Sequence, residues 1–330
     1  MRAIRIEEFG GPEVLVPVEV PDPVPQPGQV LVRIAAAGVN RADALVRSGS
    51  YHRAGRPPLT PGLEAAGTVV SAGDGVRGLA PGQRVMVIGG GTGMPGLYAE
   101  LAAVPEHRVV PLPEGIALTE AAALPSAWFT AWYCLHRLAG VARGETVVVQ
   151  AAASGVGSAA VQIAVEAGAR VIAVAGSPEK ADWAAGLGAQ ATIDTSAHPG
   201  EASVAEVLRL TGGRGAEVVL DTVGGRVFAQ SLRQTGYAGR VIALANVALE
   251  TSTIDTRDFY PKNASIQGFQ LTNLLEHGYD SRPDLQEIAA RVASGTYRVP
   301  VESVFPLERA ADAHHRLERR DNRGKVVLTV

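Results

Sequence analysis

Apolar runs and mixed polar segments alternate regularly from about residue 146 onward. The apolar runs have the length of buried strands, and the segments between them mix alanine with charged residues, as helices do. Strands that are apolar on both faces are expected in a parallel sheet with helices on either side. The predicted strands are 146–150, 170–175, 191–194, 216–221 and 240–244, and the predicted helices are 156–167, 178–187, 202–210 and 226–234.

The first 120 residues show a different pattern, in which short apolar runs are separated by closely spaced turns. This pattern predicts a small β-barrel or sandwich, with strands at 29–34, 66–70 and 85–88 and a proline-rich link at 21–28. An alanine-rich segment at 119–138 is predicted to be helical, with an interruption at Pro125. Two further helices, at 285–294 and 310–319, and a last strand at 325–330 are expected near the end.

Composition fits two globular domains and excludes several function classes. A chain of 330 residues with 46% hydrophobic and 19% charged residues has enough apolar surface for true cores, which excludes an intrinsically disordered protein. The formal net charge is −3 and aromatic residues make up 5%. Neither a basic surface nor a set of stacking rings for nucleic acid is therefore expected, and an anionic membrane has no basic patch to bind.

Cysteine usage and the start of the chain predict a cytoplasmic protein. Cys134 is the only cysteine, so no internal disulfide or thiolate cluster can form, and we expect it to be a buried small residue. The first ten residues carry acids and no long apolar core, unlike a signal peptide. Residues 146–165 lack charge over a length that could span a bilayer, but a buried strand, a glycine turn and a buried helix explain them better.

The segment 147–158 (VVVQAAASGVGS) lies between a predicted strand and a predicted helix. A dinucleotide-binding turn usually reads Gly-x-Gly-x-x-Gly, because small residues let the backbone turn tightly and approach a pyrophosphate at the helix N-terminus. Here those three positions hold Ala152, Ser154 and Gly157, with Gly155 between them. By itself the match is equally compatible with an ordinary glycine-rich turn of an α/β protein.

The end of the next predicted strand favours NADP over NAD. An NAD site places an acid about twenty residues after the last glycine, where it binds the ribose 2′-hydroxyl. Positions 173–177 read AVAGS and contain no acid; the window ends with Ser177, and Lys180 follows. A hydroxyl and an ammonium suit a 2′-phosphate; a solvated helix lysine is the alternative for Lys180.

Sequence motifs along the whole chain resemble the zinc-independent quinone oxidoreductases of the medium-chain dehydrogenase/reductase superfamily. They are GVN at 38–40, RSGSY at 47–51, PGLEAAG at 61–67, PGQRV at 81–85, LPSAWFTAW at 124–132, QAAASGVG at 150–157, DTVGG at 221–225 and GK at 324–325. The resemblance implies a GroES-like β-rich catalytic domain at 1–122 and a Rossmann domain with a doubly wound parallel sheet at 123–268. A C-terminal segment at 269–330 would return to the catalytic domain. A homodimer is also implied.

Both zinc sites of related alcohol dehydrogenases are expected to be absent. Those enzymes carry a cysteine ligand where Asn40 stands and a histidine ligand where Leu63 stands. An amide and an isobutyl group do not replace a thiolate and an imidazole. The four-cysteine lobe would fall near 89–97, where there is no cysteine, and His314 and His315 are adjacent and diverge on a helix.

The resemblance also assigns site residues. Asn40 and Tyr51 would lie at the reacting end, where either donates a hydrogen bond to the substrate oxygen and Tyr51 supplies a proton; packing alone is the alternative for Tyr51. The implied NADPH contacts are Asn40, Thr130, Ala153, Ser154, Gly155, Val156, Gly157, Ser177, Lys180, Thr195, Asn246, Phe269 and Asn322. Two departures from the family pattern are Ser154, where glycine is usual, and Thr195, where a tyrosine or a basic residue is common.

Three functions stay open on the sequence. The first is NADPH-dependent reduction of a quinone or an activated C=C bond (an enone) without zinc. The second is reduction of enoyl thioesters, for which Arg41, Arg47, Arg53 and Arg56 could form a basic entrance for a coenzyme A phosphate. The third is cofactor binding without turnover, or RNA binding as in some relatives.

Overall fold

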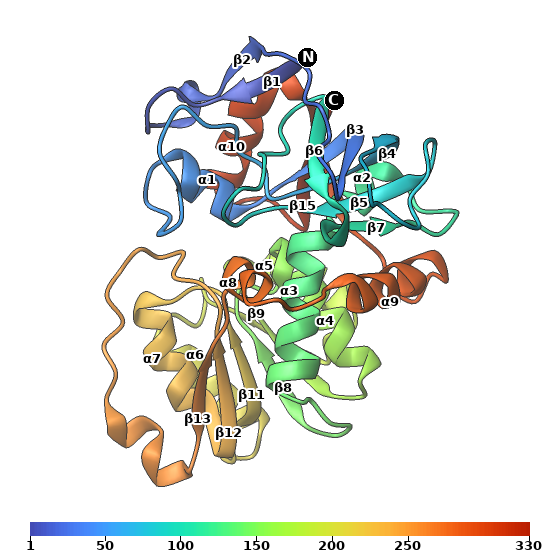
Figure 1. Ribbon diagram of the computed structural model, residues 1–330. Coiled ribbons are helices and arrows are strands. Elements are labelled where there is room, and N and C mark those ends of the chain that lie inside the picture. The colour runs from blue at the N-terminus through green and yellow to red at the C-terminus, as the bar shows by residue number, and fades with distance from the viewer. The chain divides into compact units, whose positions relative to one another are not determined.

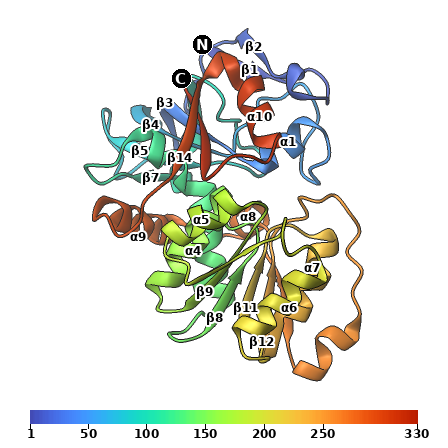
Figure 2. The same ribbon diagram turned by 180° about the vertical axis from the view of Figure 1, so that it is seen from behind.

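The computed structural model describes residues 1–330 and divides into two compact units. Unit 1 consists of residues 1–129 and 272–330, and unit 2 consists of residues 130–271. Figure 1 follows the chain from the N-terminus to the C-terminus, and Figure 2 shows it from behind.

Unit 2 contains one parallel sheet of six strands. The strands are β8 (Thr146–Val149), β9 (Arg170–Ala175), β10 (Ala191–Asp194), β11 (Ala216–Asp221), β12 (Thr235–Ala243) and β13 (Ser265–Gly268). Their order in the sheet is β10-β9-β8-β11-β12-β13, so the chain first moves to one side of β8 and then returns to the other. This is the strand order of a Rossmann fold, and its reversal point lies between β8 and β11.

Helices connect these strands and flank the sheet (Figure 1). They are α4 (Gly155–Glu166), α5 (Pro178–Gly186), α6 (Glu201–Leu210) and α7 (Gly225–Gln234). Buried valine and isoleucine residues of the strands pack with Phe228 and Leu232 of α7 in the core of unit 2. The uncharged window at 146–165 is β8, a turn and most of α4. No helix is both long and apolar enough to cross a membrane.

Unit 1 is built on a largely antiparallel sheet that joins both ends of the chain. Its strands are β3 (Gln29–Val39), β4 (Glu64–Ala72), β5 (Arg84–Ile88), β6 (Leu101–Pro105), β7 (Val109–Pro111), β14 (Val301–Pro306) and β15 (Lys325–Thr329), and a separate pair is β1 (Arg2–Arg5) with β2 (Val16–Glu19). The order is β14-β15-β3-β4-β5-β7, with β6 paired to β3. A Cβ at Gly67 would lie 1.9 Å from the Arg33 carbonyl oxygen, so glycine is required for the close pairing of β4 with β3.

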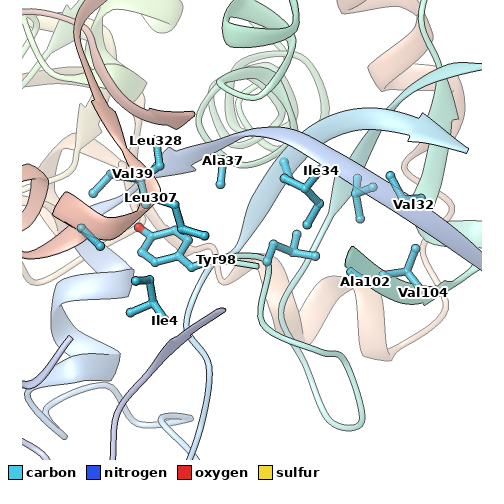
Figure 3. Close-up of a cluster of buried hydrophobic side chains, with 14 of the residues drawn as sticks. Ile4, Val32, Ile34, Ala37, Val39, Tyr98, Ala102, Val104, Leu307 and Leu328 are labelled. Atoms are coloured by element: carbon cyan, nitrogen blue, oxygen red, sulfur yellow. The ribbon is translucent and has the colours of Figure 1, made fainter. Parts of the chain in front are cut away.

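The core of unit 1 forms where side chains of this sheet meet the C-terminal segment. Figure 3 shows Tyr98 with Ile4 and Leu307 in this cluster of buried side chains. The helices of the unit include α1 (Arg41–Arg47), α2 (Leu118–Ala121), α9 (Arg282–Ala293) and α10 (Ala310–Glu318). Leu307 and the α10 residues Ala310 and Ala313 belong to this cluster, so the last sixty residues complete a core that the first hundred begin.

A run of helical turns lies where the chain passes from unit 1 to unit 2, and it includes α3 (Phe129–Trp132). Pro125 does not end the helical segment, because it falls in a π-helical turn at Leu124–Trp128, and a second such turn covers Tyr133–Leu138. After β13 the chain continues into α8 (Leu271–Glu276). Several elements differ from the sequence expectation. β3 runs on from Ile34 to Val39, and the elements that were not anticipated are β1, β6, β7, β13, β14, α1 and α8.

Candidate functional site

The turn after β8 has the geometry of a dinucleotide-binding turn. Ser154 is the N-cap of α4, and its Oγ accepts a hydrogen bond from the Gly157 N–H at 3.0 Å. A Cβ at Gly157 would lie 2.4 Å from the Ala151 carbonyl oxygen, so only glycine lets α4 pack this closely on the turn. Gly157 therefore takes the part of the third glycine of the motif.

Ser154 fits where the family usually has glycine. Its backbone has φ −73° and ψ 171°, an extended conformation open to any residue, and its hydroxyl satisfies one N–H of the helix. The N-terminus of a helix presents backbone N–H groups that bind anions such as a pyrophosphate. The residues present here, Ala153 to Gly157, thus fit a dinucleotide.

The other sequence-predicted cofactor residues of unit 2 mostly follow the ends of parallel strands. Ser177 follows β9, Thr195 follows β10, Asn246 lies beyond β12, and Phe269 follows β13. Because the carboxyl ends of parallel strands lie at one edge of the sheet, these residues share the edge that carries the Ser154 turn. Ligands of open α/β sheets bind at this edge, next to the reversal point of the strand order.

The hydroxyl groups near the expected 2′-phosphate are not equivalent. Ser177 caps α5, and its Oγ accepts from the backbone N–H of Lys180 at 3.4 Å. The Thr195 hydroxyl donates its only hydrogen to the Ala175 carbonyl at 3.1 Å. Thr195 can therefore accept a hydrogen bond from a ligand but has no hydrogen to offer a phosphate.

The residues expected near the nicotinamide have local partners. Phe269 stacks near Tyr133 with ring centroids 5.3 Å apart, and Asn246 Nδ2 donates to the Glu250 carbonyl at 2.9 Å. Thr130 is buried in unit 2. Asn322 belongs to unit 1, where it is buried and donates to the Gly324 carbonyl at 3.1 Å.

A cavity of about 520 Å³ lies in unit 1 and contains Tyr51 in its wall. Its size suits a small organic molecule. Asp43, Leu63 and the glycine-rich segment 90–96 also line it. Asn40 is not among the lining residues, although it is the N-cap of α1, the helix that supplies Asp43.

Glu276 of α8 connects two loops at the rim of this cavity. It accepts hydrogen bonds from the Thr92 N–H at 2.7 Å and the Thr92 hydroxyl at 3.1 Å, and it pairs with Arg53. The Thr92 N–H and the Arg53 guanidinium lower the pKa of Glu276 to about 2. Thr92 and Arg53 both line the cavity, so one ionised carboxylate holds both loops.

A buried ion pair links β4 and β15. Lys325 of β15 is 3% exposed and Glu64 of β4 is fully buried, and their Nζ and Oε1 atoms are 2.6 Å apart. Lys325 Nζ also donates to Asn40 Oδ1 at 2.7 Å, and Asn40 Nδ2 donates to Glu64 Oε1 at 2.8 Å. Sequence reasoning did not find this contact, because Asn40 and Lys325 are 285 residues apart.

Asp43 is fully buried with one oxygen unpaired. Its Oδ2 accepts from the Asn40 N–H at 2.8 Å, whereas its Oδ1 has no hydrogen-bond partner. Burial raises the pKa of Asp43 to about 7, against the opposing effects of the Asn40 N–H, of Lys325 and of the nearby Tyr98 hydroxyl; the Glu64 carboxylate adds to the increase. The carboxyl group is therefore partly protonated at neutral pH.

Arg47 is not an entrance residue, which corrects one sequence expectation. It is 3% exposed, pairs with Glu318 at 2.6 Å, and lies 3.4 Å from His314 Nδ1. Because a guanidinium only donates, Nδ1 of His314 accepts and Nε2 carries the hydrogen, which faces the Tyr98 hydroxyl at 3.3 Å. Burial and the nearby Arg47 charge lower the pKa of His314 to about 3.

The remaining arginines of the predicted basic entrance are dispersed. Arg53 and Arg56 line the cavity, but Arg53 is paired with Glu276. Arg41 is half-buried, and its Nε has no partner. Only Arg56 combines exposure with a place at the cavity and no ion-pair partner.

No group of three or more histidine, cysteine, aspartate and glutamate side chains is arranged to hold a metal ion. Asn40, at the position of a zinc-ligating cysteine in related enzymes, forms hydrogen bonds with Glu64 and Lys325. Cys134 is buried, and burial raises the pKa of its thiol well above the usual range, so an unreactive packing role follows.

Comparisons with known proteins identify the family. The alcohol dehydrogenase GroES-like domain matches residues 26–114, and the family described as zinc-binding dehydrogenase matches residues 155–293. Quinone oxidoreductase of Rattus norvegicus is 33% identical over 335 residues, which covers 99% of this chain and 97% of that protein.

Solved structures agree over the full length. One described as an NAD-dependent alcohol dehydrogenase is 36% identical with a TM-score of 0.90, and each chain is covered to 100%. A mycobacterial protein in complex with NADPH is 30% identical with a TM-score of 0.89, again with 100% of both chains covered. With its GroES-like and Rossmann-type domains, the chain belongs to the zinc-independent quinone oxidoreductase type of the medium-chain dehydrogenase/reductase superfamily and is an oxidoreductase.

Proposed function

We propose that this protein reduces a quinone or an enone with NADPH and without a metal ion. The observation that carries the proposal is the cavity with Tyr51 in its wall, next to a site where Asn40 and Leu63 stand in place of metal ligands. A quinone accepts a hydride readily, so it needs little activation by the protein. An enone is a poorer electrophile and needs a hydrogen-bond donor at its carbonyl oxygen.

Bound NADPH would supply the hydride. The Tyr51 hydroxyl would donate a hydrogen bond to the acceptor oxygen as negative charge develops there, and its proton would neutralise the resulting enolate. The Tyr51 N–H donates to the Leu45 carbonyl at 3.0 Å, which ties the tyrosine to the end of α1. The Asn40 amide would offer a second hydrogen bond to the same oxygen.

NADPH is favoured over NADH by the end of β9. No acid occupies positions 173–177, and Ser177 and Lys180 stand at the start of α5. A similar mycobacterial protein was solved with NADPH, which supports the same choice, whereas another similar structure is described as NAD-dependent. Thr195 adds nothing to a phosphate site, because its hydroxyl hydrogen is used by Ala175.

Reduction of an enoyl thioester is the second candidate. Arg53 and Arg56 at the cavity are the observation in its favour, because a coenzyme A phosphate needs cations near the entrance. The pairing of Arg53 with Glu276 and the burial of Arg47 leave Arg56 as the single unpaired cation there. The structure therefore supports binding of a coenzyme A phosphate less strongly than the four arginines of the sequence suggest.

We propose a homodimer formed through the edge of the unit 2 sheet. β13 is the outermost strand and pairs only with β12, and its Ile266 is 36% exposed. An edge strand with an exposed apolar side chain can pair with a second copy. Ile266→Lys should convert a dimer to a monomer in light scattering, and Val24→Lys at an exposed position outside the sheets should not. A cytoplasmic location is proposed from cysteine usage alone.

A panel of acceptors tests the proposed reaction. Purified protein of known metal content would be mixed with NADPH or NADH and with a small quinone, an enone or an enoyl thioester. We expect fast NADPH oxidation with the quinone, slower oxidation with the enone, and lower activity with NADH. Binding of NADPH without oxidation by any quinone or enone would refute the reductase and favour a binding protein.

A further inference from the structure

Two buried charged side chains and the half-buried side chain of Asn40 form a closed set of hydrogen bonds. Lys325 lies on β15, Glu64 on β4, and Asn40 at the junction of β3 and α1. The Lys325 ammonium has three hydrogens, and three acceptors surround it: Glu64 Oε1 at 2.6 Å, Asn40 Oδ1 at 2.7 Å and the Val39 carbonyl at 3.2 Å. Lys325 therefore has no hydrogen left for a substrate.

These bonds fix the orientation of the Asn40 amide. An ammonium can only donate, so the amide atom that faces it must be the oxygen Oδ1. The amide nitrogen then faces Glu64 and donates one of its two hydrogens to Oε1 at 2.8 Å. The other carboxylate oxygen of Glu64 accepts from the Ser126 N–H at 2.7 Å, which holds Glu64 in turn. One hydrogen on Asn40 Nδ2 remains outside the set.

We propose that Lys325 and Glu64 are positioning residues that hold Asn40 as a hydrogen-bond donor for the reacting carbonyl oxygen. Donation by the ammonium into Oδ1 polarises the amide and makes the remaining N–H a stronger donor, because linked hydrogen bonds reinforce one another in a buried environment. A single fixed orientation also removes the alternative in which an amide oxygen would face, and repel, a developing oxyanion.

A contribution to folding stability does not by itself explain why Glu64 and Lys325 form a buried ion pair. Removing a carboxylate and an ammonium from water is costly, and apolar residues of similar size would join β4 to β15 at least as well. The positive charge of Lys325 stands beside Asn40, at the position where zinc relatives carry a metal ligand. The inference rests on the proposed function in that it needs a carbonyl acceptor.

The paired variant Glu64→Gln/Lys325→Met tests the proposal. It removes both charges and keeps side chains of similar size. The new amide oxygen at position 64 can still accept from the Ser126 N–H, so the fold is not left with an unpaired buried charge. We expect kcat for an enone to fall ten- to a hundredfold, because a misplaced donor costs on this scale. The dissociation constant of NADPH should change much less than kcat, because Asn40 is only one of the implied NADPH contacts.

Matched variants make the test specific. The pair Glu145→Gln/Arg240→Met removes a partly buried ion pair of unit 2, whose atoms are 2.7 Å apart, and should leave kcat unchanged. In an Asn40→Ala background, Glu64→Gln/Lys325→Met should lower kcat by less than a further twofold, because Glu64 and Lys325 affect kcat only by positioning Asn40. A full additional loss in that background would overturn the proposal, and so would an unchanged kcat in the parent background.

A second readout does not depend on turnover. With asparagine labelled by ¹⁵N, the side-chain signals of Asn40, assigned by their loss in Asn40→Ala, should exchange slowly with water in the parent and much faster in Glu64→Gln/Lys325→Met. Equal exchange in both would overturn the proposed positioning. If no acceptor is reduced by the parent, the proposed function fails while this measurement still decides whether the amide is held.

Discussion

Replacing Asp43 by asparagine should change how the stability of the protein depends on pH. Asp43 is fully buried, and its pKa is raised from an ordinary value of 3.8 to about 7, chiefly by burial. Below about pH 4 the carboxyl is protonated in both the folded and the unfolded chain. Between about pH 4 and pH 7 the unfolded chain releases this proton while the folded chain keeps it, so folding becomes less favourable as pH rises.

The magnitude follows from the pKa difference. Each pH unit in this window costs about 1.4 kcal/mol, so Asp43 should lower the free energy of unfolding by about 4 kcal/mol once the pH exceeds 7. Asparagine keeps an oxygen that can accept the Asn40 N–H but does not titrate. The advantage of Asp43→Asn over the parent should therefore grow by up to about 4 kcal/mol between about pH 4 and pH 8.

Urea unfolding followed by tryptophan fluorescence measures this difference. Trp128 is fully buried in unit 1, the unit that contains Asp43, whereas Trp132 and Trp183 lie in unit 2. Replacing Trp132 and Trp183 by phenylalanine in every variant makes the signal report on unit 1. Asp182→Asn at an exposed position of α5 controls for the loss of one negative charge. A stability difference between Asp43→Asn and the parent that stays constant across this pH range would refute the assignment of a raised pKa.

Three further substitutions address cofactor and substrate. Lys180→Ala should raise the dissociation constant for NADPH about 5- to 150-fold in fluorescence titrations, as expected for a charge-assisted hydrogen bond, and should hardly change that for NADH; equal effects would contradict the 2′-phosphate contact. Tyr51→Phe should lower kcat and kcat/KM for an enone by about 10²–10⁴-fold, with a smaller loss for a quinone. The control Tyr237→Phe, at an exposed position, should not lower them. If Tyr51→Phe keeps its activity within twofold on every enone, Tyr51 is a packing residue. Glu276→Ala should raise KM for small acceptors by about tenfold, because the loops of Arg53 and Thr92 lose their shared partner, and Glu276→Gln should be milder because its amide oxygen can still accept from Thr92. Unchanged KM in Glu276→Ala would show that the loops hold their shape without it.

The Rossmann sheet could be read from the sequence because its strands are buried on both faces. Runs such as 146–149 and 170–175 are almost uniformly apolar, and such runs are informative without knowledge of their neighbours. The short helix α1 was missed, because Arg41–Arg47 carries charges at both ends and buries one of them, Arg47, against His314 and Glu318. Local pattern does not show that a charged residue is paired inside the fold.

The candidate site was predictable where a motif is local. Ser154 and Gly157 occupy one turn, and their spacing alone indicates it; the structure adds that Ser154 caps the helix. The bonds of Asn40 with Glu64 and Lys325 depend on how β3, β4 and β15 pair, which no spacing reveals. The partial protonation of Asp43 could not be predicted from the sequence either, because its pKa depends on burial in the folded state.

A deuterium-transfer experiment tests the proposed reaction most directly. The protein would reduce an enone with NADPH that carries deuterium at C4 of the nicotinamide, in the presence of a strong chelator. Protein treated in this way should convert the enone at the same rate as untreated protein. Mass spectrometry should find one deuterium at the β-carbon of the product when the transferred position carries the label. Product without deuterium from NADPH labelled on either face, or turnover that appears only after zinc is added, would contradict metal-free hydride transfer.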